Sequence, residues 1–323
     1  MSNMTKTMAI FSGSTAPALS EEIAKVLGTS LGNVKLEKFS NGEIYARYLE
    51  SVRGADVFLV QSTSTQNVNE AIMELLIMAD AAKRASARTI NAVVPCYGYA
   101  RQDRKAAARE PITAKLVANL MTAAGINRVI TIDLHQGQIQ GFFDSPVDHL
   151  TALPIFADYF KKKGLDHDRL TVVSPDVGRA KAAKKLSDML EADLAIMHKG
   201  RPGHNKAEIT ALIGDVEGKI CIVNDDMIDT AGTLCAAVET LKSKGAAEVY
   251  VCATHPVFSG PAYERLENSK IDEVVVCNTI AVPAERQTGK IKVISVAPLL
   301  ARAISNVYEN RSVAALFDPE FAL

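Results

Sequence analysis

The chain has 323 residues, 48% of them hydrophobic, and its 36 Lys and Arg nearly balance its 37 Asp and Glu. Because single hydrophobic cores usually divide near this length, we expect two domains. The formal charge of -1 offers no general attraction to nucleic acid or to an anionic membrane surface, so neither is an expected partner. The five cysteines form no CxxC pair and no apolar run approaches the roughly 18 residues of a membrane span, which indicates a cytoplasmic protein with buried thiols.

Short β-branched runs alternate with helical patterns from one end of the chain to the other. The expected strands cover 56–60, 89–94, 128–132, 170–173, 219–223, 248–252 and 273–277. Helical spacing connects Ile112, Leu116 and Leu120, and again Leu234, Val238 and Leu241, and we expect both stripes to cover a sheet. The alternation predicts an α/β fold built from mostly parallel sheets flanked by helices.

Two segments of the chain share a short internal similarity. Gly125, Val129 and His135 have the same mutual spacing as Gly245, Val249 and His255, and each set closes a predicted helix-turn-strand unit. Three matching positions leave open whether the two halves of the chain arose by duplication. We expect an N-terminal domain over 1–149, a C-terminal domain over 150–305, and a tail over 306–323 that packs on the first domain.

The most informative segment is an apolar strand that runs into two carboxylates and then a turn of small residues. Asp225 and Asp226 suit sugar hydroxyls or a hydrated metal. The turn that follows opens a helix, and its backbone N–H groups suit a phosphate; its residues are Asp229, Thr230, Ala231, Gly232 and Thr233. An acidic turn with a capping threonine is the alternative. The chain lacks GxxxxGK[ST], which disfavours a P-loop ATPase.

Further polar residues follow other predicted strands. Arg101, Gln102, Arg104 and Lys105 come after strand 89–94, where a polyphosphate would lie beyond the carboxyl end of a parallel sheet. A solvated basic turn is the alternative. His135 ends strand 128–132, where an imidazole can ligate Mg2+ or contact a phosphate, although a lone histidine there is more often structural.

Together these segments resemble the ribose-phosphate pyrophosphokinases of the bacterial class I type, also called phosphoribosyl pyrophosphate synthetases. Residues 225–233 resemble the family's phosphoribosyl-binding loop, and further similar segments cover 39–43, 95–105, 109–115, 133–143, 174–176 and 254–256. The resemblance implies two phosphoribosyltransferase-like domains, each a central, mostly parallel sheet flanked by helices. It also implies transfer of the pyrophosphoryl group of MgATP to the C1 hydroxyl of ribose 5-phosphate, giving AMP and phosphoribosyl pyrophosphate for nucleotide, histidine and tryptophan biosynthesis.

The resemblance also assigns roles to individual residues. ATP is assigned to Phe39, Asn41 and Glu43 of a neighbouring subunit and to Arg101, Gln102, Asp103 and His135. Ribose 5-phosphate is assigned to Asp225, Asp226, Asp229, Thr230, Ala231, Gly232 and Thr233. Mg2+ is assigned to His135 and Asp176, and catalytic charge neutralisation to Lys199 and Arg201 in an expected mobile flap. Inorganic phosphate, as an activator, is assigned to Ser51, Arg53, Ser86 and Ser312, and the working form is implied to be a homo-oligomer, a hexamer.

The chain departs from the family pattern at several positions. Lys199-Gly200-Arg201-Pro202 lacks the middle cation of the usual Lys-Arg-Arg-Pro, and Gly178-Arg179 stands where a Gly-Gly pair is common. Asn41 replaces an aspartate, and Ala314 replaces a hydroxyl near the regulatory serine. A phosphoribosyltransferase and a non-catalytic regulatory homologue remain alternatives at this stage. The remaining histidines are expected to be structural: His149, His167, His198, His204 and His255.

Overall fold

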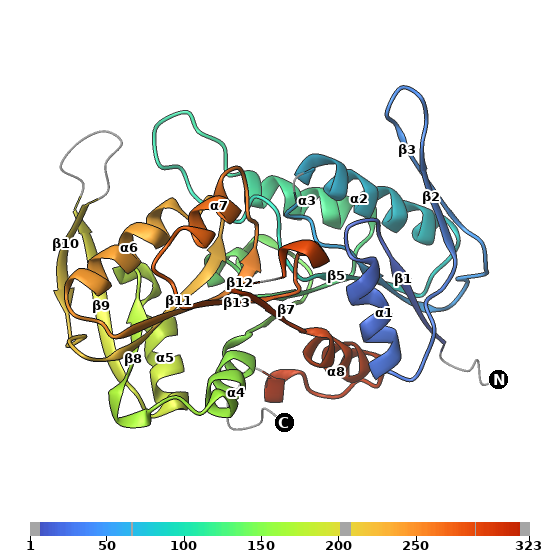
Figure 1. Ribbon diagram of the computed structural model, residues 1–323. Helices are drawn as coiled ribbons and strands as arrows, with labels where there is room; N and C mark the ends of the chain where they lie inside the picture. The colour runs from blue at the N-terminus through green and yellow to red at the C-terminus, as the bar shows by residue number, and fades with distance from the viewer. Residues whose placement is uncertain (1–6, 66, 201–207, 288, 317–323) are drawn as a thin grey trace.

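The computed structural model describes residues 7–65, 67–200, 208–287 and 289–316. The first part of the chain forms a five-stranded parallel sheet of order β1-β4-β5-β6-β7 (Figure 1). Its strands are β1 Met8–Ser12, β4 Asp56–Val60, β5 Thr89–Val94, β6 Arg128–Ile132 and β7 Val147–Leu150, and the helices of this part are α1 Pro17–Val26, α2 Val68–Arg84 and α3 Thr113–Ala124. Every residue of β4 is buried, as expected for a parallel strand that helices cover on both faces.

The second part forms a seven-stranded sheet of order β10-β9-β8-β11-β12-β13-β14, in which only the β9–β10 pair is antiparallel among the described pairings. Its strands are β8 Leu170–Ser174, β9 Asp193–Gly200, β10 Glu208–Ile213, β11 Ile220–Ile228, β12 Glu248–Pro256, β13 Glu273–Cys277 and β14 Ile291–Ile294. The accompanying helices are α4 Leu153–Lys163, α5 Ala180–Leu190, α6 Gly232–Ser243 and α7 Ala262–Glu267. The two sheets confirm the predicted α/β class.

Smaller elements connect and extend the sheets. The hairpin of β2 Val34–Lys38 and β3 Ile44–Tyr48 projects at one end of the molecule, beside α2 (Figure 1). The 3-10 helices are η1 Gly137–Phe142, η2 His167–Arg169, η3 Val177–Arg179, η4 Ala284–Arg286 and η5 Ala314–Leu316.

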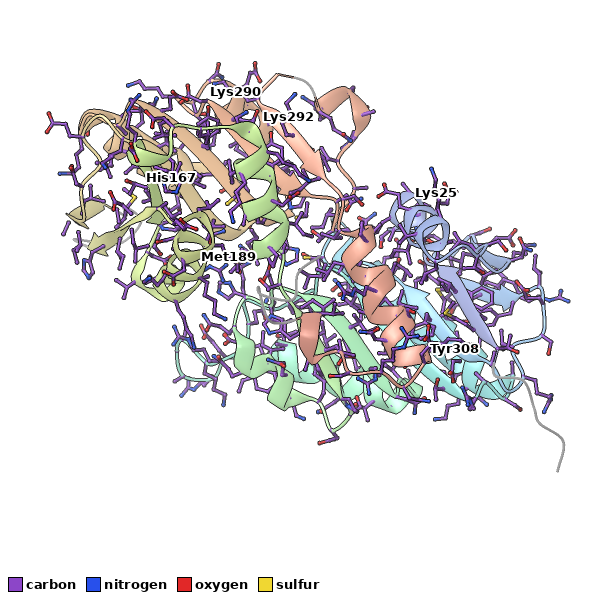
Figure 2. All side chains as sticks on the ribbon, turned by 90° about the horizontal axis from the view of Figure 1, so that it is seen from below. Lys25, His167, Met189, Lys290, Lys292 and Tyr308 are labelled. Atoms are coloured by element: carbon purple, nitrogen blue, oxygen red, sulfur yellow. The ribbon has the colours of Figure 1, made fainter. Side chains whose placement is uncertain are left out.

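The C-terminal helix α8, Ala297–Tyr308, returns to the first sheet. Its Leu300 and Ile304 share one hydrophobic core with Leu19 and Ile23 of α1. In Figure 2, Tyr308 lies with Lys25 in one half of the molecule, while His167, Met189, Lys290 and Lys292 lie in the other. The return therefore begins at α8, before residue 306.

The predicted strands agree closely with the structure. Those at 56–60, 89–94, 128–132 and 273–277 are confirmed with the same bounds, whereas β11 and β12 continue to Ile228 and Pro256. The longer β11 places Asp225 and Asp226 inside the strand, near its carboxyl end. All five cysteines are free thiols and only Cys235 is not fully buried. None of the described helices is long and apolar enough to cross a membrane.

The expectation for the Ile112, Leu116 and Leu120 stripe is wrong. The side chains of Leu116 and Leu120 are 54% and 41% exposed, and Ile112 is also exposed. The adjacent face of α3 is buried instead, through Ala114, Val117, Ala118 and Met121. Small residues let the helix approach the sheet closely, and periodicity alone does not tell which of two apolar faces does so. The second stripe, Leu234, Val238 and Leu241, is buried as expected.

Candidate active site

The carboxyl end of β11 leads directly into the predicted phosphate turn. Ala231 has a left-handed backbone with φ of 59°, and α6 begins at Gly232. The N–H groups of the first turn of a helix have no acceptor within the helix, so those near Gly232 and Thr233 are available to an anion. Arg265 supports the turn, because its Nη1 donates to the Thr230 carbonyl over 2.9 Å.

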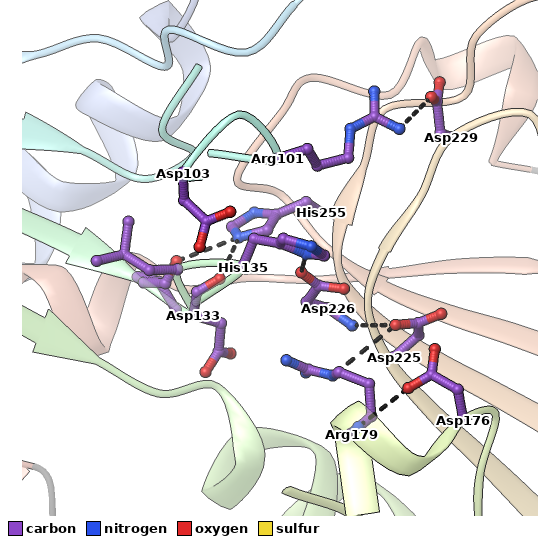
Figure 3. A network of polar contacts seen from close by, with 12 residues as sticks. Arg101, Asp103, Asp133, His135, Asp176, Arg179, Asp225, Asp226, Asp229 and His255 are labelled. Carbon is purple, nitrogen blue, oxygen red and sulfur yellow. Dashed lines mark hydrogen bonds and ion pairs between the residues drawn. The ribbon is translucent and has the colours of Figure 1, made fainter. Parts of the chain in front are cut away.

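Arg101, from the segment that follows β5, reaches this turn from the first half of the molecule. Its Nη1 donates to Asp229 Oδ2 over 2.7 Å (Figure 3). Burial acts to raise the pKa of Asp229, but hydrogen bonds from Ser259 and Arg101 outweigh burial and lower it. A cation assigned to ATP and a carboxylate assigned to the pentose phosphate therefore lie in contact.

His135 and Asp226 make a second contact between the halves. His135 Nδ1 lies 2.7 Å from Asp226 Oδ2, and this hydrogen bond raises the pKa of His135. Burial acts to raise the pKa of Asp226, but His135 and the charge of Arg179 outweigh burial and hold it below its usual range. The neighbouring Asp225 behaves in the opposite way, because burial and the charge of Asp226 raise its pKa to about 7.

Asp176 and Arg179 lie beside Asp225 in the same network of polar contacts (Figure 3). Asp176 Oδ1 accepts from the Arg179 N–H over 3.1 Å and caps η3. The Arg179 Nε lies 3.8 Å from Asp225 Oδ1. The loop after β8 is thus held beside the carboxylates at the end of β11.

Two cavities border these contacts. One, of about 640 Å³, is lined by residues of both halves, among them Tyr97, Arg101, Gln102, Asp229 and Thr230. The other, of about 490 Å³, is lined by residues that include His135, His149, Arg179, Lys181 and Asp225. Both are large enough for phosphorylated small molecules.

Gln102 and Asp103 lie near Arg101 but have internal partners. Gln102 Oε1 accepts from Thr113 Oγ1 over 2.6 Å, and the buried Asp103 accepts from Gln138 Nε2 over 3.2 Å. Gln102 lines the larger cavity, whereas Asp103 packs toward η1.

Phe39, Asn41 and Glu43 lie at the tip of the β2–β3 hairpin, away from the end of β11 (Figure 1). Phe39 is 56% exposed, and Asn41 Oδ1 accepts from the Glu43 N–H over 3.1 Å. Within one chain, the structure does not bring these residues together with Arg101 or His135.

Lys199 belongs to β9, paired with Ile209 of β10. The predicted flap continues into residues 201–207, so Arg201 lies outside the described residues.

Of the four regulatory candidates, the structure groups three. Arg53 Nη1 donates to Ser86 Oγ over 3.3 Å, and the Arg53 N–H donates to Ser51 Oγ over 3.4 Å. Ser312 follows α8, where its hydroxyl accepts from the Ala314 N–H. The four residues stay a predicted regulatory set.

Arg179 is a site residue that the sequence did not predict, because it appeared only as a departure from a glycine pair. Asn224 is another: it is buried, it lines the smaller cavity, and its Oδ1 has no hydrogen-bond partner among the described residues. In the sequence, the one indication that Asn224 belongs to the site is its position directly before Asp225.

Comparisons with known proteins identify the family. Residues 8–125 match the N-terminal domain of ribose phosphate pyrophosphokinase, and residues 199–318 match the phosphoribosyl synthetase-associated domain. The ribose-phosphate pyrophosphokinase of Bacillus caldolyticus is 56% identical over 98% of this chain and 100% of its own length, and that of Fusobacterium nucleatum is 54% identical over 96% and 98%. The crystal structure of phosphoribosylpyrophosphate synthetase from Mycobacterium smegmatis is similar with a TM-score of 0.89 and 44% identity, covering 94% of this chain and 100% of that one. The chain belongs to the ribose-phosphate pyrophosphokinase family.

Proposed function

We propose that the chain transfers the pyrophosphoryl group of MgATP to the C1 hydroxyl of ribose 5-phosphate, forming phosphoribosyl pyrophosphate and AMP. The observation that carries this proposal is the contact of Arg101 with Asp229 across the two halves. This contact brings Arg101, a cation suited to a polyphosphate, next to the turn after β11, which is suited to a sugar phosphate. A reaction between two phosphorylated substrates needs both within one site.

The pentose lies, in this proposal, along the end of β11. The turn from Asp229 to Thr233 holds the 5-phosphate through backbone N–H groups and threonine hydroxyls. Asp225 and Asp226 accept hydrogen bonds from the ribose hydroxyls. The C1 hydroxyl then faces the segment that carries Arg101.

The nucleotide lies on the other side, against Arg101, Gln102 and His135. Phosphoryl transfer spreads negative charge over the phosphoryl oxygens, so positioned cations lower the barrier while the protein does little covalent chemistry. We assign this role to Lys199 and Arg201, as their place in the family pattern suggests. Gly200 removes one cation of the pattern but leaves these two.

The residues at the end of β11 fit a magnesium ion. The pKa of Asp225 is raised to about 7 by burial and by Asp226, so added positive charge at this edge stabilises the carboxylates. Asp176 supplies a further carboxylate, and His135, bonded to Asp226 through Nδ1, keeps Nε2 for a ligand. The described residues contain no cluster of three metal-binding side chains, and Mg2+ commonly completes its shell with water and substrate phosphates. When bound, Mg2+ neutralises polyphosphate charge.

The adenine site requires a second subunit. Because Phe39, Asn41 and Glu43 lie away from Arg101 in one chain, we assign them to the ATP of a neighbouring chain and infer a homo-oligomer, a hexamer. The exposed Ile112, Leu116 and Leu120 face is suited to such an interface. We divide the chain between residues 149 and 150, one residue before the end of β7, and propose inorganic phosphate as an activator at Ser51, Arg53, Ser86 and Ser312.

The deciding experiment measures AMP released from ATP, Mg2+ and ribose 5-phosphate, with and without inorganic phosphate. We expect release to require both substrates and to fall by about 100-fold or more when Asp225→Asn and Asp226→Asn are combined. Asp158→Asn, on the exposed face of α4, is the matched control and retains activity. Absence of AMP from the unaltered protein, or formation of a nucleotide from phosphoribosyl pyrophosphate and a nucleobase without ATP, contradicts the proposal.

A further inference from the structure

The turn that presents His135 has an unfavourable backbone conformation. Asp133, directly after β6, has φ of 40°, in the left-handed region that non-glycine residues rarely adopt. Such a conformation persists only where the surroundings hold it. Within the first half, the Asp133 N–H donates to the Leu150 carbonyl over 2.9 Å, and Asp133 Oδ2 accepts from the Ala152 N–H over 2.9 Å.

The rest of the support comes from the other sheet, through two neighbouring residues at the end of β12. Thr254 Oγ1 donates to Asp133 Oδ2 over 2.7 Å. His255 Nε2 lies 3.1 Å from the Ile132 carbonyl and 3.2 Å from the Asp133 carbonyl (Figure 3). Both side chains are only 2% exposed, so these contacts are shielded from water. We call Thr254 and His255 the Asp133 clamp.

The hydrogen bonds of His255 place a proton on Nε2. Nε2 faces two carbonyl oxygens, which only accept. Nδ1 lies 3.0 Å from Thr279 Oγ1, whose own hydrogen is donated to the Thr254 carbonyl. Burial acts to lower the pKa of His255, but Cys96 and the carboxylates of Asp133 and Asp226 outweigh burial and raise it to about 9. Nε2 is thus placed to donate to both carbonyl oxygens of the Asp133 turn, while Thr279 lies at the other ring nitrogen.

We propose that Thr254 and His255 are positioning residues, which act from the second sheet on the Asp133 turn and so place His135 against Asp226. The inference rests on the proposed function, because it concerns the same reaction. Neither clamp residue is itself assigned to a substrate: their side chains contact Ile132, Asp133 and Thr279, and His255 also lies beside Cys96. The effect of the clamp is on the relative placement of the two halves of the site.

A pair of substitutions at His255 separates positioning from stability. In His255→Gln the side-chain amide reaches the place of Nε2 and still donates to the Ile132 and Asp133 carbonyls. In His255→Asn the amide reaches only the place of Nδ1. Both variants lose the buried imidazole ring and are expected to unfold at a lower temperature. We expect kcat to fall by roughly 100-fold in His255→Asn but to stay within about tenfold of the unaltered protein in His255→Gln.

Binding of ribose 5-phosphate alone supplies the second readout. Its proposed turn, Asp229 to Thr233, does not contact the clamp, so its calorimetric Kd is expected to change by less than about twofold in both variants. His167→Asn is the control, since His167 bonds the Leu190 carbonyl within the second half; it is expected to keep kcat. Equal kcat losses in the Asn and Gln variants, a matching loss of ribose 5-phosphate binding, or an unaffected His255→Asn overturns the proposal.

A second pair keeps the test decisive if His255→Asn does not fold. Thr254→Val keeps the shape of the side chain but removes the hydrogen bond to Asp133, whereas Thr254→Ser keeps the hydroxyl. We expect kcat to fall by about tenfold or more in the valine variant and to be largely retained in the serine variant. Equal rates in the two overturn the proposal. An unaltered protein that releases no AMP contradicts the proposed function itself, whatever the variants do.

Discussion

Two adjacent carboxylates at the end of β11 have opposite electrostatic environments. Asp226 is bonded to His135, which lowers its pKa, while Asp225 is left with burial and a neighbouring negative charge, which raise its pKa to about 7. The two carboxyl groups also act on each other, and Arg179 acts on both. The pair thus combines a partner of low pKa for His135 with a carboxyl group of raised pKa that a cation or a hydroxyl would stabilise.

Substitution of Asp226 is expected to remove the hydrogen bond that raises the pKa of His135. Because the hydrogen bond that His135 donates to Asp226 is the largest cause that raises the pKa of His135, and burial lowers it, Asp226→Asn is expected to shift that pKa downward. A titration of 13C-labelled histidine measures the shift, and kcat is expected to fall by about 100-fold with it. Asp215→Asn, remote on the surface, is the control. An unchanged pKa of His135 would show that the hydrogen bond is not formed in solution.

Arg179 is the distinguishing residue of this chain at the site. Its guanidinium lies beside Asp225, in a position where the family pattern has glycine. We expect Arg179→Ala to lower kcat/KM for ribose 5-phosphate by roughly tenfold, because the carboxylates lose their nearest fixed cation. Lys184→Ala, in which an exposed lysine of α5 loses only its partner Asp188, serves as the comparison. Equal values of kcat/KM in the two variants would mean that Arg179 contributes no more to the site than an exposed positive charge on α5.

At the scale of elements, the strand–turn–helix unit β11–α6 is the part of the fold to which we assign the 5-phosphate. The turn needs one left-handed residue, Ala231, to bring the first N–H groups of α6 toward the end of the strand. The next segment supports the turn from outside, because the Ser259 N–H donates to the Asp229 carbonyl over 3.0 Å. Gly232 allows the close approach of Arg265, since a Cβ at this position would lie 3.0 Å from its Nη1.

Ala231 offers a test of this turn. A β-branched residue is strongly disfavoured at φ of 59°, so Ala231→Val is expected to weaken ribose 5-phosphate binding at least fivefold, corresponding to about 1 kcal/mol or more of strain. Ala231→Gly accepts the same backbone and is expected to bind normally. Calorimetry measures the Kd for ribose 5-phosphate in the two variants. Similar values would show that the backbone conformation of the turn does not limit binding.

At the scale of the whole molecule, the site exists only because two sheets meet at their carboxyl ends. Arg101, His135 and Asp133 come from the first sheet, and their partners Asp229, Asp226 and Thr254 come from the second. The packing of α8 on α1 connects the end of the chain to its beginning. A change in the angle between the sheets would therefore alter several catalytic distances at once.

The exposed face of α3 tests the proposed assembly. Leu116→Glu combined with Leu120→Glu adds charge to side chains that do not pack in the chain itself, so the melting temperature of the isolated chain is expected to change little. We expect a smaller mass by light scattering and loss of AMP release, because we assign the adenine residues to a neighbouring subunit. Val26→Glu, at another exposed apolar position, is the control. An unchanged mass would exclude this face of α3 from the interface.

Much of this protein was predictable from local patterns. The alternation of strands and helices identified the α/β class, because side-chain periodicity depends on neighbours in the sequence. The strand–turn–helix geometry of β11–α6 was predictable for the same reason, while its binding of a phosphate stays a prediction. The exposed stripe of α3 was not predictable, since only packing distinguishes a buried apolar face from an exposed one.

The sequence by itself determined the strands, the phosphate turn and the residue types of the site, because each of these depends on a short, continuous segment. The tertiary structure alone decided which distant residues meet: Arg101 with Asp229, His135 with Asp226, and Thr254 with Asp133. His255, expected to be structural, is buried and hydrogen-bonded, and the tertiary structure adds that its partners are the Ile132 and Asp133 carbonyls. Such contacts depend on the relative placement of two sheets, and that placement results from burial summed over the whole molecule rather than from any one segment.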